Sequence, residues 1–176
     1  MRRPKRILIY NVNWLGDVLF STAVIKAIRR SFPDCFLASL LPPRCREILE
    51  DNPNLNEVIL FDEKRARFGF ISIIPFIFLL RKRRFDTCIL LHRSMTRTLI
   101  VYLAGIPRRI GFSYKKRNFL LTDIIEIPDS WKQTPICFDC LEIIEKGINF
   151  IEKYLSFKIF GINYWIIPVF IFKRKS

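Results

Sequence analysis

The stretch that decides the fold is residues 6–17, which read RILIYNVNWLGD. Its first part, residues 6–12, is apolar on both faces, as buried parallel strands are, and predicts the first strand. A helical pattern follows over residues 18–32, with apolar residues at helical spacing and cations on the other side. The turn between them carries Gly16 and Asp17 at the carboxyl end of a strand, where open α/β sheets bind their ligands.

The same alternation continues along the chain. We expect further strands at residues 35–41, 57–61, 87–91 and 109–112, and a short extended piece at 118–121. We expect helices at residues 44–51, 70–83, 94–104 and 137–146, with Pro75 near the start of one and Gly105 just past the end of another. Met95, Leu99, Tyr102 and Leu103 share one face of the helix at 94–104. Alternating strands and helices predict a parallel, doubly wound α/β sheet.

Length and charge limit the remaining possibilities. After Gly147 the apolar residues no longer follow a helix or strand periodicity. We therefore expect one α/β domain over residues 1–147 and a divergent apolar and basic tail over 148–176. The net charge of +14 suits nucleic acid, an anionic membrane surface or an anionic substrate as partner. We see no secretory signal and no apolar run that spans a bilayer, which predicts a cytoplasmic location. Residues 68–84, apolar and then basic, suit a membrane contact, or equally a core-packed helix with a basic end.

Few residues are left to carry chemistry. The chain has no GxGxxG, no GxxxxGKS and no DxD motif, so we expect no Rossmann or P-loop signature and no metal site. Asp17 and the turn at His92–Ser94 remain, each after a predicted strand. An aspartate at position 17 also suits a simple helix cap, and the helix dipole would lower the pKa of its carboxyl group. Ser94 suits the N-cap of the next helix.

Taken in order, several short segments resemble glycosyltransferase family 9, the lipopolysaccharide heptosyltransferases. The resemblance runs from about Arg6 to about Leu121, and its strength lies in the order and spacing of the pieces. The segments that carry it are residues 6–9, 13–19, 52–55, 85–86, 92–94 and 103–112.

The resemblance implies a Rossmann-like sheet that is the amino-terminal half of a GT-B glycosyltransferase. In such an enzyme this half holds the acceptor, and the other half binds a nucleotide sugar such as ADP-heptose. The transfer inverts the anomeric centre and needs no metal and no cofactor. Nothing after Gly147 resembles the donor-binding half, so we expect a truncated member whose missing donor domain lies on a separate chain or is lost.

The resemblance also assigns residues. Asp17 matches the general base, and Asn13, Trp14 and Gly16 would shape the first turn and touch the acceptor. Among the acceptor-binding residues we also count Arg93 and Ser94, which match the second turn, and Arg97. Members often carry an arginine at the position of Thr96, so Arg97 stands one residue later than expected.

The implied partner is an anionic, lipid-linked sugar of the lipopolysaccharide core. Cations would bind it and would favour the anionic inner-membrane surface by roughly 1 kcal/mol each. One alternative is a non-catalytic remnant that binds the acceptor or a membrane. Another, a basic nucleic-acid-binding protein, rests on charge alone. No nucleic-acid-binding motif accompanies the basic runs, so we expect no nucleic acid as partner.

Overall fold

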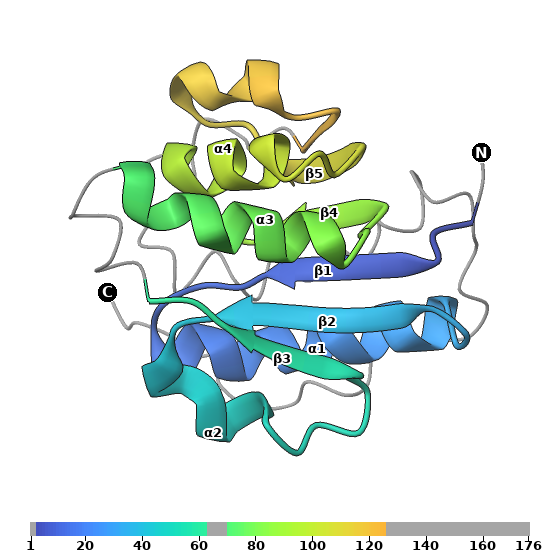
Figure 1. Ribbon diagram of the computed structural model, residues 1–176. Helices are drawn as coiled ribbons and strands as arrows, with labels where there is room; N and C mark the ends of the chain where they lie inside the picture. Colours follow the sequence, from blue (N-terminus) through green and yellow to red (C-terminus); the bar gives the residue numbers. More distant parts are fainter. Residues whose placement is uncertain (1–2, 63–69, 126–176) are drawn as a thin grey trace, which may run out of the picture.

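The computed structural model describes residues 3–62 and 70–125, which form a six-stranded sheet flanked by helices (Figure 1). The strand order is β3-β2-β1-β4-β5-β6, and every neighbouring pair is parallel. The strands are β1 (Arg6–Tyr10), β2 (Phe36–Leu41), β3 (Glu57–Leu60), β4 (Thr87–Leu90), β5 (Arg108–Phe112) and β6 (Asp123–Ile125). The Rossmann-like α/β fold expected from the sequence is therefore confirmed.

The helices cover both faces of this sheet. The α-helices are α1 (Leu15–Ser31), α2 (Arg46–Leu49), α3 (Ile74–Lys82) and α4 (Met95–Leu103), and the 3₁₀ turns are η1 (Pro43–Cys45), η3 (Phe70–Ile73) and η4 (Lys115–Leu120). One core lies between the sheet and the α1–α2 side, and a second lies between the sheet and the α3–α4 side (Figure 1). Alternate residues of β1 supply the two cores, Ile7 and Ile9 facing α1, and Leu8 and Tyr10 facing α3 and α4.

The chain reverses its direction of travel across the sheet at β1. It runs outward from β1 through β2 to β3, and then returns to place β4 on the other side of β1, where Tyr10 pairs with Leu90. The arrowheads of β1 and β2 point to the left in Figure 1. In open α/β sheets a ligand binds outside the carboxyl ends of the strands at such a switch point. The turns after β1 and β4 are the two that the sequence singled out.

Two expectations about local structure were wrong. Helix α1 begins at Leu15, not at residue 18, with Trp14 in extended backbone as its N-cap, so Asp17 lies inside the first turn. Residues 118–121 are not extended: η4 covers Lys115–Leu120, and the chain then forms a strand, β6, that the sequence pattern did not reveal.

Other expectations agree with the structure. Pro75 lies in the first turn of α3, and Gly105 has a φ of +74° just beyond the end of α4, as a C′ glycine requires. The predicted helix at 137–146, the boundary at residue 147 and the tail at 148–176 fall outside the described residues. Within residues 3–62 and 70–125, no helix is long and apolar enough to cross a membrane.

Candidate functional site

Asp17 is a buried carboxylate at the carboxyl edge of the sheet. It is only 5% exposed, and among the described residues it accepts no hydrogen bond and forms no ion pair. Burial raises the pKa of its carboxyl group above the ordinary value. The expected lowering by the helix dipole is therefore wrong, because desolvation outweighs it. The simple capping role is excluded too, since Trp14 is the N-cap and the Asp17 side chain caps nothing. A desolvated carboxylate without a partner is costly, which is typical of functional sites.

Asn11 organises the turn that carries Asp17. Its side chain is fully buried, and its Nδ2 donates to Ser21 Oγ at 2.8 Å and to Ser39 Oγ at 3.3 Å. Its Oδ1 accepts from the backbone N–H of Val12 at 2.8 Å. This one amide thus joins the end of β1 to α1 and to β2. The turn is held by a network whose polar atoms are satisfied, which favours a single conformation.

Arg97 connects this turn to the next one. It lies in α4, is 2% exposed, and its Nη1 donates to the carbonyl of Asn11 at 2.5 Å. Its Nη2 donates to Asn13 Oδ1, and its guanidinium lies 5.0 Å from the centre of the Tyr10 ring. The side chain therefore extends from α4, the helix after β4, and hydrogen-bonds the turn after β1. The two turns predicted from the sequence are brought together by this arginine.

The outer surface of the first turn is open and aromatic. Trp14 is 72% exposed, and the guanidinium of Arg44 lies 5.9 Å from its ring centre. The same guanidinium donates to the carbonyl of Asn13 through Nε at 3.1 Å and Nη2 at 2.7 Å. Gly16 is exposed as well, and a Cβ added there would meet nothing within 4 Å. Its φ does not require glycine either, so fold alone does not explain a glycine at this position.

The second turn follows β4. Ser94 is the N-cap of α4, and its Oγ accepts from the backbone N–H of Arg97 at 3.5 Å, which confirms the capping expectation. His92, Arg93 and Ser94 are all half-buried. The carbonyl of His92 accepts a hydrogen bond of 2.6 Å from Nη1 of Arg117, whose side chain is 1% exposed. Each turn thus accepts a hydrogen bond from a buried arginine, the first turn from Arg97 and the second from Arg117.

The structure places the predicted residues in two groups. Asn13, Trp14, Gly16 and Asp17 lie in or beside the first turn, Arg93 and Ser94 lie in the second, and Arg97 joins the two. The sequence analysis missed Asn11, Arg44 and Arg117. A polar residue next to a buried strand was a signal for Asn11, but no local pattern marked the two arginines. Among residues 3–62 and 70–125, no three His, Cys, Asp or Glu side chains lie together as metal ligands would. Metal-independent chemistry stays a prediction.

Comparison with curated proteins points to one class of enzyme. The chain is similar to lipopolysaccharide heptosyltransferase 2 of Escherichia coli (strain K12), at 27% identity over 119 residues, which is 68% of this chain and 34% of that protein. It is also similar to lipopolysaccharide heptosyltransferase 2 of Salmonella typhimurium (strain LT2), at 28% identity over 72% of this chain and 36% of that protein. The chain spans about a third of the length of these curated relatives.

Solved structures agree. The structure of Escherichia coli ADP-heptose lps heptosyltransferase II matches with a TM-score of 0.58 and 26% identity, over 72% of this chain and 36% of that one. The glycosyl transferase family 9 structure from Veillonella parvula matches with a TM-score of 0.66 and 20% identity, over 80% and 41% of the two chains, and so supports the fold. The amino-terminal region of this chain is therefore like that of the family 9 heptosyltransferases.

One family model matches a different part of the chain. It is described as "CRISPR-associated protein TM1802 (cas_TM1802) central domain" and covers residues 113–176. This match takes in less than half of the chain and leaves out β1, β4 and both turns of the candidate site. It therefore assigns no family to the two turns of the candidate site.

Proposed function

We propose that this chain supplies the acceptor-binding side of an inverting, metal-independent heptosyltransferase with a GT-B architecture. Its acceptor is a sugar of the lipopolysaccharide core, and its donor is a nucleotide sugar such as ADP-heptose. The observation that carries the proposal is the Asp17 carboxylate, buried and unpaired among the described residues at the switch point of a heptosyltransferase-like sheet. In this proposal the donor is bound by a part of the enzyme that this chain, which spans 34% of one curated relative, does not match.

In this proposal Asp17 acts as the general base. As the acceptor hydroxyl oxygen forms its bond to the anomeric carbon, the bond from that carbon to the nucleotide diphosphate breaks, and the hydroxyl proton passes to the Asp17 carboxylate. A general base works best when its pKa lies near the working pH. Burial moves the pKa of Asp17 in that direction, and a carboxylate with no other hydrogen-bond donor among the described residues has its oxygens available for the acceptor.

The remaining residues of the site hold the acceptor and the base in place. The exposed ring of Trp14 offers an apolar surface of the kind on which sugars stack, and the open space at Gly16 lets a ligand approach the backbone beside Asp17. Arg93 and Ser94 contribute a cation and a hydroxyl for an anionic sugar. Arg97, gripping Asn11 and Asn13, fixes the turn to which the base belongs. These roles stay predictions until they are measured.

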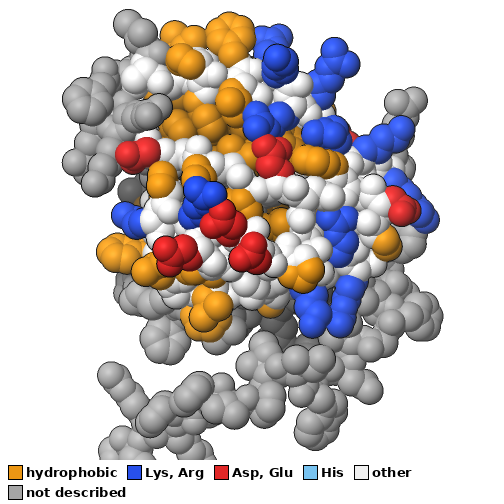
Figure 2. Space-filling view, turned by 60° about the horizontal axis from the view of Figure 1, so that its bottom comes forward, with side chains coloured by type: hydrophobic (Ala, Val, Ile, Leu, Met, Phe, Trp, Pro, Cys, Tyr) orange, Lys and Arg blue, Asp and Glu red, His pale blue; other side chains and the backbone are white. Residues whose placement is uncertain are grey.

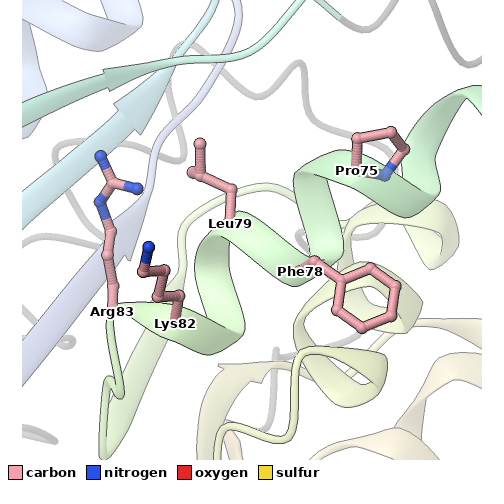
Figure 3. A pocket seen from close by; sticks show the side chains of 5 residues that line it. All are labelled: Pro75, Phe78, Leu79, Lys82 and Arg83. Carbon is pink, nitrogen blue, oxygen red and sulfur yellow. The ribbon is translucent and has the colours of Figure 1, made fainter.

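A second surface suits the lipid-linked nature of the proposed acceptor. Pro75, Phe78, Leu79, Lys82 and Arg83 line a shallow pocket on α3, with the phenylalanine towards one end and the cations at the other (Figure 3). Phe78 is 61% exposed, whereas Ile77 and Leu80 on the other side of the same helix are core residues. Helix α3 thus both packs into the core and offers an apolar and basic face to its surroundings, which favours peripheral attachment to the inner membrane.

Charge is not spread evenly over the molecule. Figure 2 shows the side at the bottom of Figure 1, where acidic side chains lie mostly towards the left and basic ones mostly towards the right and the top. An anionic surface is attracted only to the faces where cations prevail. This side is mixed, so we place the membrane contact at α3, where exposed Arg81 and Lys82 follow Phe78.

The proposal is tested by transfer and binding with one pair of variants. The chain, joined to the part of Escherichia coli lipopolysaccharide heptosyltransferase 2 that it does not match, is incubated with ADP-heptose and a deacylated lipopolysaccharide core oligosaccharide. The gain of one heptose is followed by mass spectrometry, and oligosaccharide binding is measured by calorimetry. Asp17→Asn should lower transfer at least about 100-fold and leave binding within twofold. Asp34→Asn, at an exposed aspartate, is the matched control and should change neither.

The outcomes separate the proposal from its alternative. Binding of the oligosaccharide without any transfer by this completed chain supports the alternative, a non-catalytic acceptor-binding module. Transfer that survives Asp17→Asn at full rate contradicts the role of Asp17 as base. An unaltered chain that neither binds the oligosaccharide nor transfers heptose contradicts the proposed function as a whole.

A further inference from the structure

Arg117 is a buried cation that the proposed chemistry does not use directly. It lies in η4 and is 1% exposed, and among the described residues its side-chain hydrogen bonds all go to backbone carbonyls. Nε and Nη2 donate to the carbonyl of Phe112 at 3.2 Å and 2.8 Å, and Nη1 donates to the carbonyl of His92 at 2.6 Å. One planar guanidinium therefore ties the end of β5 to the residue that follows β4.

The surroundings of Arg117 are unusual for a buried charge. Among the described residues no carboxylate pairs with it, in contrast to Arg108, which bonds Asp123. Burial, together with the nearby charge of Arg93, lowers the pKa of Arg117 to about 10. Because like charges repel, a fixed cation at position 117 disfavours every arrangement of Arg93 that brings the two guanidinium groups together. The two charges therefore interact, and Arg117 contributes to the electrostatic environment of Arg93.

The sequence leaves room for this guanidinium at Gly111 in β5. A Cβ added at Gly111 would lie 3.1 Å from Nη2 of Arg117 and 3.2 Å from Cδ2 of Leu121. The φ of Gly111 is not positive, so the glycine serves close approach rather than backbone conformation. The guanidinium of Arg117 therefore has one defined position, fixed by its two carbonyl acceptors and by the space that Gly111 leaves for it.

We propose that Arg117 is a positioning residue for the second turn of the site, holding the His92 carbonyl so that Arg93 and Ser94 are presented to the anionic acceptor. The expected effect on acceptor binding rests on the proposed function. The expected effect on the order of residues 91–98 does not. Lysine cannot replace arginine here, because a single ammonium group lacks the planar fork that spans the carbonyl of Phe112 in β5 and that of His92 in the turn after β4.

The test compares Arg117→Lys with Arg109→Lys in the full chain. Arg109 is a matched control, because its guanidinium also donates to backbone carbonyls, those of Leu120, Ile106 and Pro107. It lies at the amino-terminal end of β5, away from the site. Amide hydrogen exchange is measured over residues 91–98, and binding of the deacylated core oligosaccharide is measured by calorimetry. Thermal unfolding of both variants separates a general loss of stability from a local one.

We expect Arg117→Lys to speed exchange at residues 91–98 at least tenfold and to raise the dissociation constant for the oligosaccharide at least tenfold. Arg109→Lys should change both by less than twofold, even where it lowers the melting temperature as much. Unchanged exchange in Arg117→Lys, or equal effects in the two variants, would overturn the inference. If the unaltered chain binds no oligosaccharide, the proposed function fails, and the exchange result alone decides the positioning role of Arg117.

Discussion

Nη1 of Arg97 donates a hydrogen bond of 2.5 Å to the carbonyl of Asn11, so the helix that follows β4 holds the turn that follows β1. These two turns meet at the switch point of the sheet, where the order of strands reverses. The contact joins residues that are far apart in the sequence, and it places Asp17, Asn13 and Ser94 in one region.

Arg97→Lys should loosen the first turn. Lysine keeps the positive charge but cannot donate to the Asn11 carbonyl and the Asn13 side chain in the same fixed geometry. We expect a loss of about 2–4 kcal/mol in the free energy of unfolding, since hydrogen bonds to a charged donor contribute about 1.5–3 kcal/mol each. Urea unfolding followed by Trp fluorescence measures it. A variant as stable as the unaltered chain would contradict the holding role of Arg97.

Asn11 offers a sharper test of the same network. In Asn11→Asp the Nδ2 donors to Ser21 and Ser39 are lost and a charge is placed in a buried site. In Asn11→Ala the donors are lost without a new charge. We expect both to destabilise the chain, by about 1–3 kcal/mol for alanine and by more for aspartate at neutral pH. Equal effects of the two substitutions at pH 7 would argue against a buried, water-excluded position for this side chain.

Asp17→Asn should stabilise the chain although it removes the proposed base. The folded-state pKa of Asp17 lies above the ordinary value, so the folded chain binds more protons than the unfolded chain between the two pKa values. Stability therefore falls as pH rises through this window, and the penalty is complete above the folded-state pKa. The asparagine variant avoids it, so we expect a gain of about 0.5–2 kcal/mol at pH 7 that disappears at acid pH. Thermal unfolding against pH measures this difference, and a variant less stable than the unaltered chain at pH 7 would contradict it.

Gly16→Ala adds a single Cβ atom, whose effect on stability can be told apart from its effect on acceptor binding. The added Cβ has nothing within 4 Å in the structure, and alanine favours a helix by up to about 1 kcal/mol over glycine. We expect the variant to be as stable as the unaltered chain or slightly more so, and to bind the core oligosaccharide at least tenfold more weakly. Unchanged binding would show that the acceptor does not approach the backbone at Gly16.

Membrane attachment through α3 is tested with the paired substitutions Phe78→Ser and Lys82→Ser. We expect this double variant to lose most of its binding to vesicles that contain anionic phospholipid in a sedimentation assay. Phe119→Ser is the control, because Phe119 is 72% exposed but lies in η4 rather than on α3. Equal loss from both proteins, or none from either, would argue against α3 as the contact.

The sequence predicted the fold well because its signals are local. Apolar runs bounded by turns located β1 to β5, and Gly105 and Ser94 marked the two ends of α4. Strand β6 was missed because Asp123–Ile125 is three residues long and is fixed by its pairing with β5, which no local pattern reports. On α4, Met95 and Tyr102 are exposed although they share an apolar face, whereas Arg97 is buried. Ile100, Val101 and Ala104 form the apolar inward side of this helix together with Arg97, so the face chosen from the sequence was the wrong one.

The residues in the two turns of the candidate site could be predicted from the sequence, but the buried contacts that hold these turns could not. Turns after β1 and β4 are recognisable from strand ends, and so Asp17 and Ser94 were found. The buried state of Asp17, which reverses the expected direction of its pKa, depends on packing that only the fold provides. The roles of Asn11 and Arg117 depend on partners on other strands, and the sequence places neither partner beside them.

The most direct test of the account is a titration of the Asp17 side chain by carbon-13 NMR, with and without the deacylated core oligosaccharide. The Asp17→Asn variant identifies the resonance. We expect the pKa of Asp17 to lie above the ordinary value for aspartate, and we expect its resonance to shift when the oligosaccharide binds. A carboxyl group that titrates at or below the ordinary value and does not respond to the oligosaccharide would contradict the claim that Asp17 is the base of an acceptor site.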